Sequence, residues 1–128
     1  MTPAAALGPI LALALITNAS HAQPKRHPDK ARRFTASAYC DKGTTKSGIP
    51  VRQGIVAADP RVLPLGTVVQ VQHTDGRSAT YLVADTGSAV KGRHLDIFMS
   101  SCAAAKRFGR RTVLARVTRS APAQDQER

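Results

Sequence analysis

Six short segments rich in β-branched and other apolar residues alternate with glycine and proline turns, and only one further segment has helical character. Six short strands and one helix in about 85 residues predict a mainly β fold, a closed or nearly closed small barrel. Asp75-Gly76 is typical of a tight hairpin turn between the third strand and the fourth. The predicted strands cover residues 34–40, 54–58, 67–73, 79–84, 94–98 and 112–118.

The single predicted helix spans residues 102–108. Ser100 or Ser101 precedes it as an N-cap, because a serine hydroxyl can accept a hydrogen bond from a free backbone N–H of the first turn. Basic side chains occupy its last turn, where they complement the helix dipole, and Gly109 follows as the stop signal.

The first 22 residues predict a secretory signal peptide. They carry no Lys, Arg, Asp or Glu, and an apolar run over residues 4–16 precedes small residues at Ser20 and Ala22, which favours cleavage before Gln23. The run falls short of the roughly 20 apolar residues that a bilayer-spanning helix requires. We therefore expect export to the periplasm, the cell wall or the extracellular space.

The remaining residues, about 106, are enough for one small domain. Residues 23–33 are basic and contain proline, which predicts a flexible tether, and the folded domain is expected at residues 34–119. Residues 120–128 form a polar stretch that predicts a disordered tail.

The charge balance is strongly basic, with 19 Lys and Arg against 8 Asp and Glu and a net charge of +11. Such a balance usually indicates nucleic acid. Few aromatic residues, the lack of a basic helix and the expected export argue against a nucleic-acid partner, so an anionic surface outside the cytoplasm fits better.

Two cysteines, Cys40 and Cys102, lie in the predicted domain. Cysteines of small exported domains usually pair, so we expect a disulfide between them. Neither cysteine has a second ligand at zinc-site spacing, and the sequence gives no sign of a metal or an organic cofactor.

Three aspartates stand in distinctive short phrases: Ala58-Asp59-Pro60, Asp85-Thr86-Gly87 and Leu95-Asp96-Ile97. In a chain with so few acids, this placement favours acid–base chemistry over surface solvation. Strand alternation sends Leu95 and Ile97 into the core and turns Asp96 to the other face with His94 and Phe98. There an aromatic neighbour and a second carboxylate are expected to raise the pKa of Asp96.

The phrases TASAYC, TKSGIPV, GIVAADPRVLPLGT, VADTGSAVKGRHLDIF and AAAKRFGRR occur in this order. This series resembles the 3D domain, which is named for its three aspartates, and its most specific element is Asp85-Thr86-Gly87 followed by Asp96 in a strand. It is also similar to the catalytic domain of membrane-bound lytic transglycosylase A and, more distantly, to rare lipoprotein A and the expansins. The resemblance implies a six-stranded double-psi β-barrel with one short helix.

The resemblance also implies an activity: a lytic transglycosylase that cleaves the β-1,4 bond between N-acetylmuramic acid and N-acetylglucosamine in peptidoglycan glycan strands and leaves a 1,6-anhydro end. Asp96 is then the acid/base and Asp85 the supporting acid. The large second domain of that transglycosylase is missing here, so substrate affinity is weak or a wall-associated partner protein supplies the second wall of the groove. The expected substrate-binding residues are Asp59, Thr35, Tyr39, Thr86, Gly87, Lys91 and Arg93.

Other interpretations stay open. Asp59 before a proline is more often a turn-former, Asp85 can simply hold its Thr-Gly turn, and His94 is more often a barrel-rim residue than a proton shuttle. At the level of function, the alternatives are a non-catalytic, expansin-like glycan-binding module, a hydrolase that uses water, and an aspartic protease built on Asp85-Thr86-Gly87.

Overall fold

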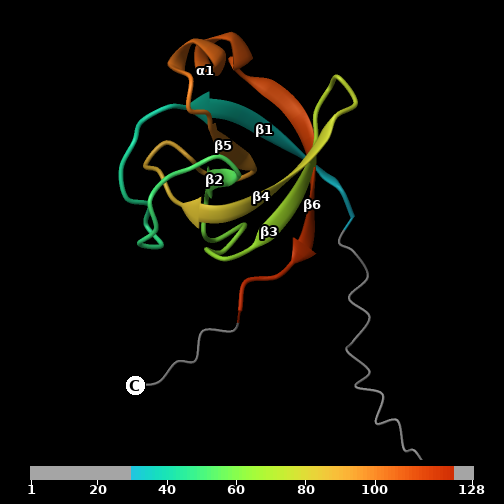
Figure 1. Ribbon diagram of the computed structural model, residues 1–128. Coiled ribbons are helices and arrows are strands. Elements are labelled where there is room, and N and C mark those ends of the chain that lie inside the picture. The colour runs from blue at the N-terminus through green and yellow to red at the C-terminus, as the bar shows by residue number, and fades with distance from the viewer. Residues whose placement is uncertain (1–29, 123–128) are drawn as a thin grey trace, which may run out of the picture.

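The computed structural model describes residues 30–122, which form six strands and one helix (Figure 1). The predicted signal peptide, most of the predicted tether and residues 123–128 of the predicted tail lie outside the described residues. No helix within residues 30–122 is long and apolar enough to span a bilayer. The elements are β1 (Arg32–Tyr39), β2 (Ile55–Ala58), β3 (Val68–Gln72), β4 (Ser78–Asp85), β5 (His94–Phe98), α1 (Cys102–Phe108) and β6 (Arg111–Arg119).

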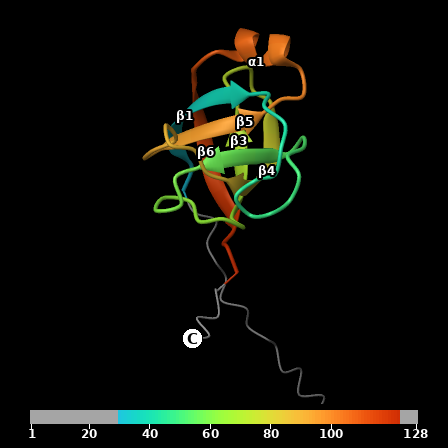
Figure 2. The same cartoon turned by 90° about the vertical axis from the view of Figure 1, so that its left-hand side faces the viewer.

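The six strands close into a barrel in the order β1-β5-β2-β4-β3-β6, with β6 paired to β1 again. Two pairs, β1 with β5 and β2 with β4, are parallel, and the others are antiparallel. Figures 1 and 2 show from two directions that α1 lies across one end of the ring. The prediction of a mainly β fold with six short strands and one helix is confirmed.

Strand alternation fills the inside of the ring with apolar side chains. Leu95 and Ile97 of β5 belong to the buried core, as do Phe34 and Ala36 of β1. Their sequence neighbours consequently face outward, and Asp96 lies between two core residues. The polar side chains of these strands therefore lie on the outer wall of the barrel.

The Asp75-Gly76 turn joins β3 to β4 as predicted. The carboxylate of Asp75 accepts a hydrogen bond from the backbone N–H of Arg77 at 2.9 Å, and the N–H of Gly76 donates to the carbonyl of His73 at 3.0 Å. Gly76 has a φ of +85°, which glycine adopts without a steric penalty. The turn therefore sets the register in which Gln72 pairs with Ser78.

The helix has the predicted ends, and a disulfide fastens it to the barrel. The Ser101 hydroxyl accepts a hydrogen bond from the N–H of Ala104 at 3.1 Å, and Gly109 ends the helix with a φ of +61°. Cys102, the first helical residue, is bonded to Cys40, which directly follows β1, with 5.1 Å between the Cα atoms. The expected disulfide is confirmed.

Strand β1 begins at Arg32, two residues earlier than expected. Its first residues pair with β6, Arg32 with Ala115 and Arg33 with Leu114. The basic composition of this stretch predicted a tether, which is wrong for Arg32 and Arg33. Their backbones form strand pairs while their charged side chains remain exposed, so a basic composition does not exclude a strand.

Candidate active site

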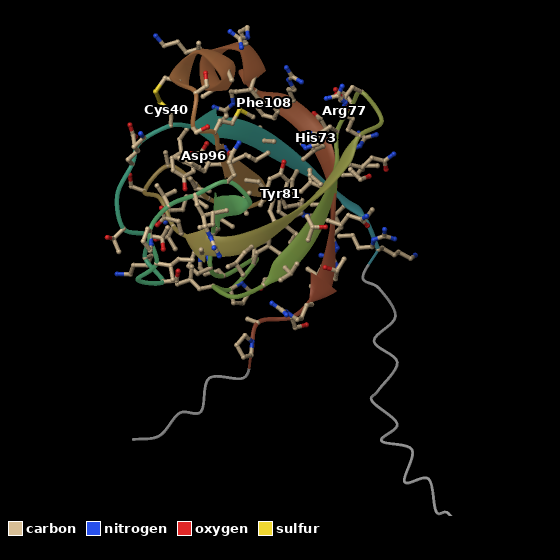
Figure 3. All side chains as sticks on the ribbon, viewed as in Figure 1. Cys40, His73, Arg77, Tyr81, Asp96 and Phe108 are labelled. Carbon is tan, nitrogen blue, oxygen red and sulfur yellow. A yellow bond between two sulfur atoms is a disulfide. The ribbon has the colours of Figure 1, made fainter. Side chains whose placement is uncertain are left out.

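A groove of about 310 Å³ lies on the outer wall of the barrel, beneath the loop that follows β1. Asp96 belongs to its lining and, in Figure 3, lies on the same side of the molecule as Cys40. The predicted residues Asp85, Tyr39, Thr86 and Gly87 meet Asp96 there. The remaining lining residues are Asp41, Lys42, Gly43, Thr44, Val51, Ala57 and Val90.

Three adjacent strands place the two predicted catalytic carboxylates in one row. Ala57 of β2 pairs with Asp96 of β5 on one side and with Asp85 of β4 on the other. Two strand spacings put the Cα atoms of the aspartates roughly 10 Å apart. Because the methyl group of Ala57 is the only side chain between them in this row, the row is open to a ligand.

A bulge brings Asp85 into that row. Between Val56 and Ala57 the pairing of β2 with β4 slips by one residue, so Val56 pairs with Val83 whereas Ala57 pairs with Asp85 and passes over Ala84. With regular pairing, the buried Ala84 would stand opposite Ala57. Bulges commonly redirect a side chain in this way next to active sites.

The surroundings of Asp96 favour its protonated form. Partial burial raises the pKa of Asp96 above its ordinary value, and the carboxylates of Asp41 and Asp85 add to the increase. A hydrogen bond from Ser37 and the charge of His94 oppose these effects and lower the pKa of Asp96 without cancelling the increase. A carboxyl group that holds its proton above the usual pH range is suited to general acid catalysis.

Asp85 ties the wall of the groove together. Its Oδ1 atom accepts hydrogen bonds from the backbone N–H groups of Thr86 at 2.9 Å and Lys46 at 3.0 Å. The N–H of Ser47 also donates to the carbonyl of Ala84 at 3.0 Å, so the loop after β1 is docked on the end of β4. Asp85 thus holds its own turn, as one interpretation expected, and also faces the groove.

The aromatic ring beside Asp96 in the groove is Tyr39, which corrects the expectation that Phe98 would play this part. Phe98 shares the outward face with Asp96 but is buried, and it packs edge-on against Tyr39 with ring centroids 5.5 Å apart. The Tyr39 hydroxyl is buried and has no partner of hydrogen-bond geometry among the described residues. Burial, with the nearby Asp85 and Asp96 carboxylates, raises the pKa of Tyr39 to about 12.

Gly87 lines the groove at a point where an added side chain would press against the wall. A Cβ atom at this position would lie 2.9 Å from a methyl group of Val90, which is buried in the same wall. Three other predicted ligands do not line the groove: Thr35, which pairs with His94, and the exposed Lys91 and Arg93. Arg93 instead borders a separate cavity of about 120 Å³.

Asp59, the third aspartate, is buried outside the groove and serves as a clamp. Its carboxylate accepts hydrogen bonds from the Arg61 side chain at 2.9 and 3.1 Å, from the Arg61 N–H at 3.0 Å and from the Gly92 N–H at 2.9 Å. The Arg61 bonds hold the pKa of Asp59 far below its ordinary value. This placement fits the turn-forming interpretation and anchors the segment that leads into β5.

Asp59→Asn is expected to lower the melting temperature by several degrees at neutral pH, because Arg61 and Gly92 lose an ionised acceptor. Since the folded pKa is depressed, the stabilisation is present above the unfolded pKa of about 4 and is lost as the pH falls toward the folded pKa. The difference between wild type and variant should therefore shrink in acid. A pH-independent difference in thermal melts would contradict this role; Asp75→Asn, in an exposed pair with Arg77, is the control.

Two parts of the site were not predicted from the sequence. Ser37, between the named Thr35 and Tyr39 on the outward face of β1, donates a hydrogen bond to Asp96 at 2.9 Å. Period-two alternation would have found it. The loop over residues 41–51 contains the phrase TKSGIPV, but its place beside the groove was not predicted, because that place depends on backbone contacts with β4. Within residues 30–122, no group of three or more His, Cys, Asp or Glu side chains is arranged to hold a metal ion.

Comparison with known protein sequences gives a match to the 3D domain family over residues 54–118, about half of the chain. The cell wall-binding protein YocH of Bacillus subtilis is 35% identical over 91 residues, which cover 68% of this chain and 30% of YocH. RlpA of Aquifex aeolicus, named a probable endolytic peptidoglycan transglycosylase, is 44% identical over 66 residues, which cover 51% of this chain and 28% of RlpA. The chain thus spans less than a third of either relative.

Two solved structures share the fold at low sequence identity. Escherichia coli MltA with bound chitohexaose superposes with a TM-score of 0.55 at 22% identity and covers 64% of this chain and 29% of MltA. The Streptomyces papain inhibitor superposes with a TM-score of 0.57 at 22% identity and covers 73% of this chain and 98% of the inhibitor. The same barrel therefore occurs both as part of a larger protein and alone.

Proposed function

Because this chain belongs to the 3D domain family, we propose that it is a lytic transglycosylase acting on peptidoglycan glycan strands, with Asp96 as acid and base. The observation that carries the proposal is the position of Asp96, which is partly buried in a groove, has a raised pKa and lies one residue across the sheet from Asp85. The names of RlpA and of the MltA complex with chitohexaose support a glycan as the ligand.

One carboxyl group suffices for the proposed reaction. Protonated Asp96 donates its proton to the glycosidic oxygen, the bond from C1 to that oxygen breaks, and positive charge develops on the muramic ring. Asp96, now a carboxylate, accepts the proton of the C6 hydroxyl as its oxygen attacks C1 and closes the 1,6-anhydro ring. The carboxyl group is restored, whereas glycoside hydrolysis commonly requires a carboxylate pair and a water molecule.

The distribution of charge supports a wall-associated protein. Of the five aspartates in residues 30–122, Asp59 and Asp75 are paired with arginines, and the other three line the groove. The net charge of +11 attracts the chain to anionic polymers, while the aspartates without an arginine partner lie in the groove. With the wall-related names of its relatives, this supports export and an extracytoplasmic location.

We also propose that the barrel has the double-psi topology. The two parallel pairs, β1 with β5 and β2 with β4, lie side by side through the antiparallel pair of β2 and β5. This arrangement brings the ends of β1, β4 and β5 to one groove, which supports the topology and explains the position of the site.

A second candidate function is binding of wall glycans without cleavage. It is favoured by the name of YocH and by the open groove on the outer wall of the barrel. A wall-associated partner protein would then provide the second wall. The aspartic protease interpretation has less support. Such a protease requires two carboxylates that share one site, whereas Ala57 lies between Asp85 and Asp96 in the row.

The function can be tested by incubating the full chain with purified sacculi and measuring soluble sugar and pelleted protein. The transglycosylase proposal expects soluble fragments that increase with time. Binding of the protein to the pellet without soluble fragments would favour the second candidate. The absence of both binding and fragment release would contradict both candidates.

Asp85→Asn is expected to slow release of fragments about ten- to a hundredfold, less than loss of Asp96, because it weakens the docking of the groove loop but leaves the acid in place. Initial rates on sacculi would measure the effect. A rate as low as that of an Asp96 variant would mean that Asp85 takes part in the chemistry directly, as it would in a hydrolase.

A further inference from the structure

The hydroxyl group of Ser37 stands between Asp96 and His94. Its Oγ atom lies 2.9 Å from Oδ1 of Asp96 and 2.7 Å from Nε2 of His94. The parallel pairing of β1 with β5 produces this chain of contacts, because Ser37 is the partner of Asp96 and Thr35 the partner of His94. Ser37 and His94 do not line the groove, so they meet Asp96 from the side away from a ligand.

A hydroxyl group has one hydrogen to donate, so the hydrogen bonds of Ser37 to Asp96 and His94 can be arranged in only a few ways. If Ser37 donates to Asp96, the short contact to His94 requires a hydrogen on Nε2 that Ser37 accepts. Oδ1 of Asp96 then serves as an acceptor, and the exchangeable proton of the carboxyl group resides on Oδ2. If His94 instead carries its hydrogen on Nδ1, Nε2 becomes the acceptor and the Ser37 proton turns away from Asp96.

We propose that Ser37 and His94 are positioning residues that direct the proton of Asp96 to Oδ2, the oxygen left free for a substrate. This inference rests on the proposed function only for its consequence in catalysis. We call the hydrogen-bonded series from His94 through Ser37 to Asp96 the relay. The relay is a property of the free protein, since it depends on two hydrogen bonds between neighbouring strands.

The other groups that face Asp96 do not take over this part. Tyr39 on β1, Asp41 in the following loop and Asp85 on β4 are the titratable neighbours besides His94, and Ala57 on β2 contributes no polar atom. The two aspartates raise the pKa of Asp96, whereas Ser37 and His94 lower it. Removal of Ser37 should therefore raise the pKa of Asp96. The carboxylates of Asp41 and Asp85 cannot offset this increase, because they raise the pKa of Asp96 themselves.

The test is an NMR titration of the full chain without substrate, following the carboxyl carbon of Asp96 and the ring nitrogens of His94. In Ser37→Ala the pKa of Asp96 should be higher than in wild type by roughly half to one pH unit, a three- to tenfold change in the dissociation constant. Ser37→Thr keeps a hydroxyl and should restore the wild-type value. In wild type at a pH where Asp96 is ionised, neutral His94 should carry its hydrogen on Nε2.

Two internal controls accompany the titration. His94→Gln keeps an N–H near the position of Nε2 but cannot titrate, so it should preserve the Ser37 bond to Asp96. His73, which contacts the Tyr81 hydroxyl at 3.3 Å and lies apart from Asp96 in Figure 3, should titrate identically in all variants. An unchanged Asp96 midpoint in Ser37→Ala, or a hydrogen on Nδ1 of His94, would overturn the relay.

The pH profile of fragment release separates the relay from a structural role. In Ser37→Ala the alkaline limb should move to higher pH together with the Asp96 titration, and the maximal rate should fall. A lower rate with an unmoved profile would contradict the relay. If wild type releases no fragments but the NMR shifts occur, the relay stands and the proposed function fails.

Discussion

Asp96→Asn is expected to reduce the release of soluble fragments from sacculi by at least about a hundredfold, which is the lower end of the usual contribution of general acid–base catalysis. The amide keeps the shape of the side chain but cannot donate the acidic proton or take it back. Initial rates over a range of pH would measure the loss. Asp75→Asn removes the same charge on the far hairpin and should leave the rate unchanged.

Thermal melts separate loss of chemistry from loss of fold. The raised folded pKa of Asp96 means that its ionisation opposes folding above that pKa, so Asp96→Asn should be as stable as wild type or more stable at neutral pH. The gain should disappear in acid, where the carboxyl group is protonated in both states. Appreciable activity in a folded Asp96→Asn protein would exclude Asp96 as the acid.

Reduction of the Cys40–Cys102 disulfide is expected to have the largest effect on stability. The bond closes a loop with a sequence separation of 62 residues, which corresponds to about 4 kcal/mol of unfolding free energy on the chain-entropy model. That amount is a large part of the total stability of a small domain. Equilibrium denaturation in urea with and without a reducing agent would measure it.

A double variant, Cys40→Ala with Cys102→Ala, is the matched control, because a reducing agent should not change its denaturation curve. Cys40 immediately precedes the groove residues Asp41 and Lys42, so fragment release should decrease with stability. Coincident denaturation curves for oxidised and reduced wild type would show that the disulfide does not stabilise the folded chain.

Local features of the fold were readable from the sequence because they depend on nearby residues. The alternation in β5 places Leu95 and Ile97 in the core, Asp75-Gly76 turns the chain between β3 and β4, and Ser101 caps the helix. The pairing of the only two cysteines followed from composition and the expected compartment. In the candidate site, strand alternation predicted the outward direction of Asp96, and the family resemblance supplied its role. The raised pKa of Asp96 was expected from an aromatic neighbour and a second carboxylate, whereas burial is its largest cause.

Features that depend on pairing between distant strands were not readable. The bulge that aligns Asp85 with Ala57 and the pairing of Ser37 with Asp96 arise from register, which sequence patterns of single strands do not encode. Phe98 was expected beside Asp96, but it is buried against Tyr39. Asp59 was assigned to substrate on family resemblance, whereas its carboxylate is occupied by Arg61 and Gly92.

The most direct measurement is mass spectrometry of the fragments that the full chain releases from purified sacculi in water enriched in heavy oxygen. If Asp96 recycles its proton and the C6 hydroxyl closes the ring, the new ends are 1,6-anhydro sugars, lighter by one water than reducing ends and free of heavy oxygen. Reducing ends that carry one heavy oxygen per cut would mean hydrolysis by water and would contradict the proposed function.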